Sequence, residues 1–140
     1  MVLAARRKGE TDEAVAALAD EGVAAKAILV DLSKPDCATV VADGLKRLGL
    51  TADILVNAAG INLRQPFMDV TADAFDLHMA LHLRAPFLLT QVLAPRMAAN
   101  GYGRVINLAS LQSTRAFPNS APYGAGKGGI VQLTRAIAEE

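Results

Sequence analysis

The sequence predicts a doubly wound α/β fold, and three observations support that prediction. Short apolar runs suited to strands alternate along the chain with longer amphipathic stretches suited to helices. The short runs are continuously apolar, which is typical of parallel strands covered on both faces. Crossover helices connect such strands, and no linker or repeat interrupts the pattern, so residues 1–140 are expected to form a single domain.

The first crossover is expected between strands at 2–5 and 27–30. Thr11 is a candidate N-cap for a helix over 12–21, because its hydroxyl can accept from a free N–H of the first turn. Gly22 follows, and glycine tolerates the left-handed conformation that commonly ends a helix, so the helix is predicted to stop there.

The second helix is predicted after a cap at Ser33, with Pro35 in its first turn. Its apolar residues recur at steps of three and four, which makes one stripe along the helix. That stripe consists of Cys37, Val41, Leu45 and Leu48. Gly49 is expected to end the helix, and a buried strand at 54–56 follows.

The second half of the chain begins with a helical stretch over 72–97. Pro86 is expected to break it into two pieces, because proline lacks an N–H and clashes with the preceding turn. A strand at 105–108 follows. A loop over 111–122 then leads into a final helix at 123–139.

Composition and charge exclude several classes of function. Hydrophobic residues make up 52% and charged residues 20%, so the chain is not intrinsically disordered. The 14 basic and 14 acidic residues cancel, which argues against nucleic acid as a partner. No apolar run approaches the roughly 18 residues of a membrane helix. The single cysteine, Cys37, excludes an internal disulfide framework, and a cytoplasmic protein without a metal site is expected.

A glycine-rich stretch, Gly124-x-Gly126-x-x-Gly129, has the spacing of a dinucleotide-binding loop. Such a loop needs a strand directly before it, and a loop rich in proline and serine stands there instead. We expect these glycines to allow close packing of the last helix.

Three residues around the last strand form a workable acid–base set. Tyr123 and Lys127 are four positions apart and so share a helix face, while Ser110 follows the preceding strand. A nearby ammonium favours the phenolate form of a tyrosine, and a serine hydroxyl can hold a substrate oxygen. From spacing alone, a helix-end aromatic residue beside a solvated lysine is the simpler alternative.

Other polar residues follow the strands at the rim where parallel sheets bind ligands. With Tyr123, Lys127 and the serine 13 residues before the tyrosine, they resemble the short-chain dehydrogenase/reductase family. The matching rim features are Asp31 and the turn Asn57-Ala58-Ala59-Gly60. The resemblance covers essentially the whole chain, and it implies a Rossmann-type fold and hydride transfer between a nicotinamide cofactor and an alcohol or ketone.

The resemblance also implies roles for the matching residues. Tyr123 would be the acid/base, Lys127 would bind the nicotinamide ribose, and Ser110 would orient the substrate oxygen. The adenine side of the cofactor would contact Asp31 and Leu32. The turn after the third strand would also contact the cofactor, through Asn57, Ala58 and Gly60.

Cofactor choice follows from charge at the end of the first strand. Family members selective for NAD carry an acid there, which accepts from the ribose hydroxyls. Here the chain reads Arg6-Arg7, and two cations suit a 2′-phosphate, so NADP is expected over NAD. Two solvated arginines in a surface loop are the alternative.

The sequence departs from the family pattern at His82, where the family carries a helix-borne asparagine. That asparagine helps to hold a water in a proton relay behind the lysine. His82 can donate or accept a hydrogen bond and is a candidate catalytic residue, with an ordinary helix histidine as the alternative.

A second departure concerns the ends of the family fold. The resemblance implies that its glycine-rich first strand and its last strands lie outside residues 1–140. Because that first strand is central in the sheet, strands 2–5 and 54–56 are expected to show unpaired facing edges. We therefore expect residues 1–140 alone to be marginally stable and to bind dinucleotides poorly.

Substrate and partner predictions rest on loop residues and helix faces. Arg64 and Gln112 lie near the expected pocket and look similar to the sugar-acid branch of the family, of the gluconate 5-dehydrogenase type. The apolar faces of helices at 83–97 and 130–137 resemble the family's oligomer interface, which implies a homo-oligomer, with core burial as the alternative. Two rival functions stay open: an inactive chain that only associates with a full-length relative, and a binding domain for another ligand.

Overall fold

The computed structural model describes residues 1–140 and confirms the alternation of strands and helices. Its elements, in chain order, are β1 (Val2–Ala5), α1 (Lys8–Asp20), β2 (Lys26–Leu29), α2 (Cys37–Arg47), β3 (Ile54–Asn57), η1 (Phe67–Asp69), α3 (Ala72–Met79), η2 (Ala80–Arg84), α4 (Ala85–Ala99), β4 (Arg104–Asn107), η3 (Leu111–Ser113) and α5 (Ala121–Ile137). No helix is both long enough and apolar enough to cross a membrane.

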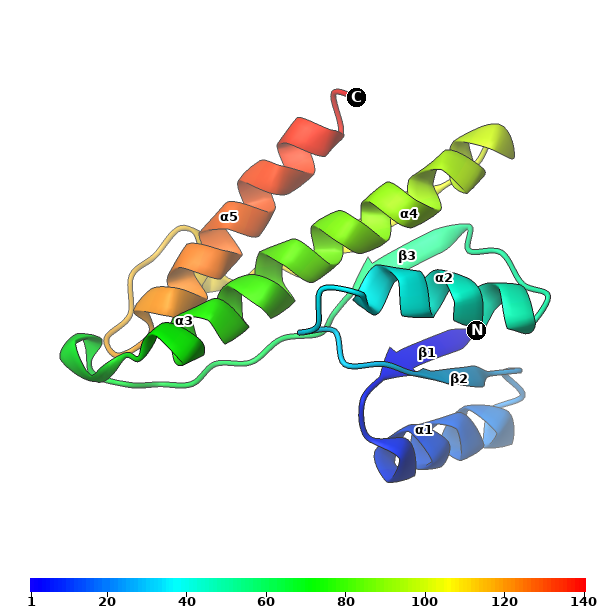
Figure 1. Cartoon of the computed structure of the whole chain (residues 1–140), viewed down its shortest axis with the longest axis horizontal. Helices are drawn as coiled ribbons and strands as arrows, with labels where there is room; N and C mark the ends of the chain where they lie inside the picture. Colours follow the sequence, from blue (N-terminus) through cyan, green and yellow to red (C-terminus); the bar gives the residue numbers. More distant parts are fainter.

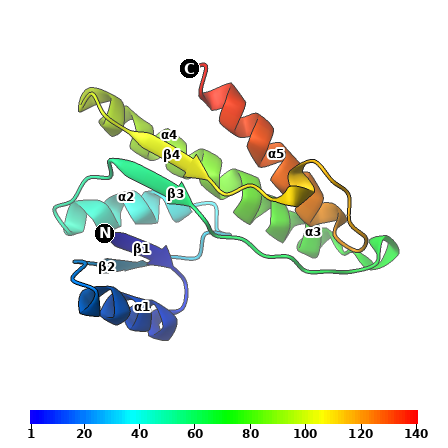
Figure 2. The same ribbon diagram turned by 180° about the vertical axis from the view of Figure 1, so that it is seen from behind.

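The four strands form two parallel pairs rather than one continuous sheet. β1 pairs with β2 and β3 pairs with β4, each in a register of four residues. Both views place β1 on the side of its pair that is nearer to β3 (Figures 1 and 2). No ladder joins β1 to β3, so the predicted pair of open facing edges is confirmed.

The backbone hydrogen bonds of a strand alternate between its two sides, and this alternation identifies the groups that face the open edges. In a parallel ladder, successive residues bond to opposite sides. Because the flanking odd-numbered residues of β1 and β3 bond to β2 and β4, the N–H and C=O groups of Val2, Ala4, Ile54 and Val56 point away from their paired neighbours. This geometry leaves both edges able to accept a further strand.

The core lies between β2, α2 and α4. The predicted stripe on α2 is confirmed, since Cys37, Val41 and Leu45 are buried and Leu48 packs beside them. From α4, the core receives Leu89, Leu93 and Met97. α2 therefore connects the β1–β2 pair to the helix that supports β3 and β4.

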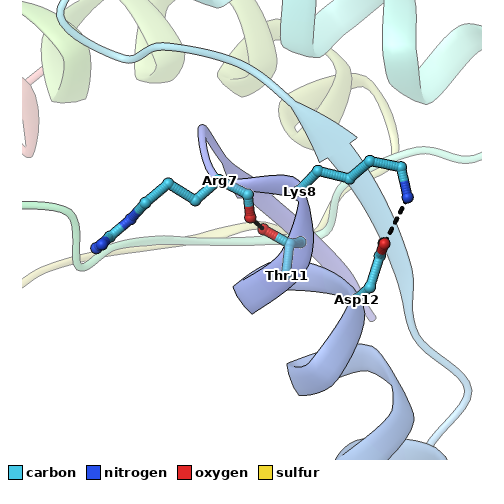
Figure 3. A network of polar contacts seen from close by, with 4 residues as sticks. All are labelled: Arg7, Lys8, Thr11 and Asp12. Atoms are coloured by element: carbon cyan, nitrogen blue, oxygen red, sulfur yellow. Dashed lines mark hydrogen bonds and ion pairs between the residues drawn. The ribbon is translucent and has the colours of Figure 1, made fainter.

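The first helix begins earlier than the sequence suggested. α1 starts at Lys8, so Thr11 lies inside the helix and the predicted cap is wrong. Its hydroxyl donates to the Arg7 carbonyl at 2.7 Å, and Lys8 pairs with Asp12 one turn later (Figure 3). The threonine thus bonds back to the turn before it instead of accepting at the helix start. Gly22 ends the helix with φ of 77°, as predicted.

The long helix from Ala72 is not broken at Pro86. Proline occupies the first turn of α4, where its missing N–H is tolerated, and the chain continues from α3 through the π-helical turn η2 into α4. The irregularity lies just before the proline, in Ala80–Arg84. Such π turns often mark functional positions, and this one carries His82.

Candidate active site

Tyr123 and Lys127 lie on the first turns of α5, as their spacing predicted. The Lys127 side chain is buried, and its Nζ lies 5.8 Å from the centre of the Tyr123 ring. The ammonium donates to the Leu108 carbonyl at 2.5 Å, at the end of β4. The lysine is therefore not a solvated cation, which removes the simpler alternative drawn from spacing.

Ser110 begins the short turn η3 between β4 and α5. Its hydroxyl accepts from the Gln112 N–H at 3.2 Å, while the Ser113 hydroxyl donates to the Lys127 carbonyl at 2.6 Å. These bonds tie the serine-bearing turn to the helix that carries Tyr123. The fold thus brings the predicted serine, tyrosine and lysine into one region from two elements.

His82 is buried against this region. Its ring meets the Tyr123 ring edge-on, with centroids 5.2 Å apart, and its Nε2 lies 2.8 Å from the Ile61 carbonyl oxygen. Burial lowers the pKa of His82, and the charges of Lys127 and His78 lower it further, against the opposing effect of the Ile61 bond. The imidazole is therefore neutral near pH 7 and links the loop after β3 to α5.

Two glycines have no room for a side chain because of His82. A Cβ on Gly60 would lie 2.6 Å from the imidazole Cε1, and a Cβ on Gly126 would lie 2.8 Å from the His82 Cβ. The predicted packing role is confirmed at Gly126 and at Gly129, which abuts Leu83, but it is wrong at Gly124, where a Cβ would meet nothing closer than 3.8 Å. The glycine of the turn after β3 is needed for close approach rather than for an unusual backbone angle.

The turn after β3 is anchored by an asparagine that sequence reasoning missed. The Asn57 amide donates to the Asn107 side-chain oxygen at 2.8 Å, and Asn107 donates onward to the Thr134 hydroxyl at 2.9 Å. Each asparagine ends one of the two paired strands, and that shared position was the available signal. Ala58, next in the turn, is exposed.

Asp31 and Leu32 follow β2 at the same rim. The Ser33 hydroxyl and N–H both donate to the Asp31 carboxylate, and they hold its pKa below the usual value. The predicted helix cap at Ser33 is therefore wrong, because Asp36 precedes α2 and the serine closes a local turn instead. Leu32 packs its side chain against the core.

The two arginines after β1 differ in their contacts. Arg7 pairs with Glu10 at 2.6 Å on the first turn of α1. Arg6 is exposed and makes no ion pair or side-chain hydrogen bond, and its charge contributes to the lowered pKa of Asp31. Arg6 is therefore a cation at this rim that is free to meet an anionic ligand, and the exposed Lys34 is another.

The two predicted substrate residues lie on neighbouring loops. Gln112 lines a cavity of about 500 Å³ with Gln65, Phe67 and Ser120. Arg64 is exposed and lies 3.4 Å from the Pro118 carbonyl oxygen, outside the residues that line this cavity. The structure thus places Gln112 in a concave surface but leaves Arg64 at its margin.

Comparisons with known proteins agree with this geometry. The sequence model of the short chain dehydrogenase family matches residues 1–140. The chain is 31% identical to a gluconate 5-dehydrogenase of Gluconobacter oxydans (strain 621H) over 140 residues, which cover 100% of this chain and 55% of that relative.

Solved structures show the same similarity. The chain superposes on a gluconate 5-dehydrogenase from Burkholderia cenocepacia J2315 in complex with NADP and tartrate, with a TM-score of 0.88, 32% identity and coverage of 99% and 54% of the two chains. It also matches the L-sorbose reductase from Gluconobacter frateurii complexed with NADPH and L-sorbose, with a TM-score of 0.92, 27% identity and coverage of 99% and 53%. The chain spans about half the length of these relatives.

Proposed function

Because this chain belongs to the short-chain dehydrogenase family, we propose that it carries the acid–base centre of an NADP-dependent oxidoreductase acting on a polar alcohol or ketone. The observation that supports this most is the buried Lys127 ammonium beside the Tyr123 ring, held at the end of β4. A buried lysine without a carboxylate partner is unusual in a purely structural role.

The proposed roles follow from the placement of each group. The Tyr123 hydroxyl moves a proton to or from the substrate oxygen, and the Ser110 hydroxyl orients that oxygen. Lys127 holds its charge beside the tyrosine and binds the ribose of the cofactor. A nicotinamide cofactor, when bound, supplies or accepts the hydride.

The residues at the rim fit a nicotinamide dinucleotide by their chemistry. Arg6 is an exposed guanidinium without a protein partner, which suits a 2′-phosphate. Asp31 and Leu32 stand beside it for the adenine side, and the turn carrying Asn57, Ala58 and Gly60 is held by Asn107 and His82.

The decisive experiment replaces Tyr123 by phenylalanine. Residues 1–140 would be exchanged for the matching half of the Gluconobacter oxydans relative, so that the rest of the fold is supplied. In that chimera, Tyr123→Phe is expected to lower kcat roughly 10²–10⁴-fold because no other group carries the proton. Tyr102→Phe, at an exposed tyrosine, is the control and should leave kcat unchanged. Near-normal turnover by the Tyr123 variant would contradict the assignment.

Cofactor preference has a similarly matched test. Arg6→Asp in the chimera is expected to shift the ratio of kcat/KM for NADP over NAD at least about tenfold toward NAD, since a phosphate contact is lost and a repulsion added. Arg7→Asp, at the arginine already paired with Glu10, should move the ratio much less. Equal effects of the two variants would remove Arg6 from cofactor selection.

For the substrate, we propose a sugar acid or a related polyol. Gln112 supplies a polar group to the cavity wall, and Arg64 lies at the cavity margin, where a modest loop movement would bring it to a carboxylate. Arg64→Met should then raise KM for a keto sugar acid while leaving KM for the neutral ketose unchanged. A parallel rise in both values would show that Arg64 supports the loop only.

The proposed partner is a further copy of the chain. Helices η2, α4 and α5 border an open apolar hollow of about 790 Å³, lined by residues that include Leu83, Phe87, Gly129 and Leu133. Leu89, Leu93 and Ile130 are buried within the subunit, so only part of the predicted helix faces stays open to a partner. Light scattering of the wild-type protein and of Phe87→Glu would test this, with a monomeric wild-type protein contradicting it.

A further inference from the structure

The only two histidines of the chain occupy successive turns of one helical stretch. His78 lies in the last turn of α3 and His82 lies in η2, four residues later. Their exposed fractions are 0% and 2%, so both rings lie among protein atoms. Histidines so fully buried need hydrogen-bond partners for their ring nitrogens.

Both rings bond to the same stretch of backbone, which follows the turn after β3. The Leu63 N–H lies 3.3 Å from Nε2 of His78, and the Ile61 carbonyl oxygen lies 2.8 Å from Nε2 of His82. Nε2 therefore faces a hydrogen-bond donor in His78 and a hydrogen-bond acceptor in His82.

These partners fix opposite tautomers. A backbone N–H can only donate, so Nε2 of His78 is bare, and its Nδ1–H donates to the Ala74 carbonyl at 2.7 Å. A carbonyl can only accept, so Nε2 of His82 carries the proton and its Nδ1 is bare. That Nδ1 is buried and has no partner.

From this geometry we propose that His78 and His82 are a pair of positioning residues that clamp residues 61–63 between them, each as a different neutral tautomer. The consequence for catalysis rests on the proposed function: the clamped segment joins the turn carrying Gly60 to Arg64. His82 also fills the space between that turn and Gly126, so the clamp sets the distance from the turn to the helix bearing Tyr123.

Protonation of His82 would disturb this arrangement. A proton on Nδ1 of His82 would enter a buried position without an acceptor. The groups that face His82 are Tyr123 and Lys127 from α5 and His78 from α3, and none is a carboxylate. The segment at 60–63 adds no titratable side chain. The bond from His82 to Ile61 is therefore expected to hold at neutral pH and to loosen in acid.

Nuclear magnetic resonance can read the two tautomers directly. In the ¹⁵N-labelled 140-residue chain at pH 7.5, long-range ¹H–¹⁵N spectra should show the Nδ1–H form for His78 and the Nε2–H form for His82, assigned with single His→Gln variants. A mixture of tautomers at either ring, whether from a loose segment or from an unfolded chain, would overturn the proposal.

Hydrogen exchange of the Leu63 amide gives a second measurement, and a conservative variant of His78 tests whether protection is restored. His78→Leu should speed exchange of the Leu63 N–H at least tenfold relative to wild type, because leucine offers no acceptor. His78→Gln should restore much of the protection, since its side-chain oxygen reaches about as far as Nε2. Equal exchange in the two variants would mean that ring volume alone matters and would overturn the proposal. Both readouts are independent of cofactor and turnover, so the clamp and the proposed function can fail separately.

Discussion

The two faces of the β3–β4 sheet carry similar apolar residues but meet different surroundings. On one face, Leu55 and Val105 pack against the core formed with α2 and α4. On the other, Ile54, Val56 and Ile106 each keep about half of their surface exposed, at 52%, 53% and 49%. An apolar run thus identifies a strand, but whether both of its faces are covered depends on which elements the rest of the protein places there.

The largest difference between the two faces is expected on the covered side. Leu89→Ala, in the core between α2 and α4, should lower the free energy of unfolding by about 2–5 kcal/mol, because it removes buried contacts and leaves a cavity. Val92→Ala, at a position of the same helix that is 41% exposed, is the control and should cost under about 1 kcal/mol. Urea unfolding followed by circular dichroism measures both, and equal losses would mean that the helical layer is not a packed core.

A second contrast lies within one helix on the covered side. Gly126→Ala should destabilise the protein by about 1–3 kcal/mol, because the new methyl group would press on the His82 Cβ. Gly124→Ala is the matched control: its Cβ would meet nothing closer than the Gln112 carbonyl oxygen at 3.8 Å, and alanine favours helix by about 1 kcal/mol. A stabilising effect of Gly126→Ala would contradict the close approach of α5 to η2.

The helical layer that covers one face of the β3–β4 sheet is also expected to lose stability as the pH falls. Burial holds the pKa of His82 below 6.5 in the folded protein, so the unfolded chain takes up the proton first as the pH falls. Stability is therefore expected to be constant above pH 6.5 and to decrease below it, by at most about 1.4 kcal/mol per pH unit, until the folded-state pKa is passed. Denaturant titrations between pH 7.5 and 5 would show this slope in the wild-type protein and a smaller one in His82→Gln. Equal slopes would mean that another group is responsible.

The smallest effect is expected on the uncovered face. Ile106→Thr should change the free energy of unfolding by no more than about 0.5 kcal/mol, because the side chain is already half exposed and threonine suits a strand. Binding of a fluorescent hydrophobic dye should fall at the same time, since the exposed apolar surface shrinks. A loss above about 2 kcal/mol would show that a partner or another segment covers this face in solution.

Errors in the element boundaries have a common physical origin. Thr11 and Ser33 were expected to cap helices because short hydroxyl side chains do so, but each found a nearer partner, the Arg7 carbonyl and the Asp31 carboxylate. Pro86 was expected to break a helix, yet it lies where an N–H is dispensable. In each case the residue type correctly indicated a helix boundary nearby. It did not indicate where the residue lies relative to the start of the helix.

The candidate site was more predictable than these boundaries, because its spacing is local. Tyr123 and Lys127 share a helix face whatever the rest of the chain does, and Ser110 follows from the end of a strand. The anchoring role of Asn107 depends on the register of β4 against β3, and the role of His78 depends on a loop 15 residues away. Such partners leave no periodic signal in the sequence.

By itself the sequence determined the alternation of strands and helices, the apolar stripe of α2 and the i, i+4 pair of Tyr123 and Lys127, because these depend only on backbone geometry and residue type. Tertiary structure alone decided which sheet face stays uncovered and how His78 and His82 bond to residues 61–63. These features join segments distant in the chain, and packing settles their relative positions after local geometry has settled the elements.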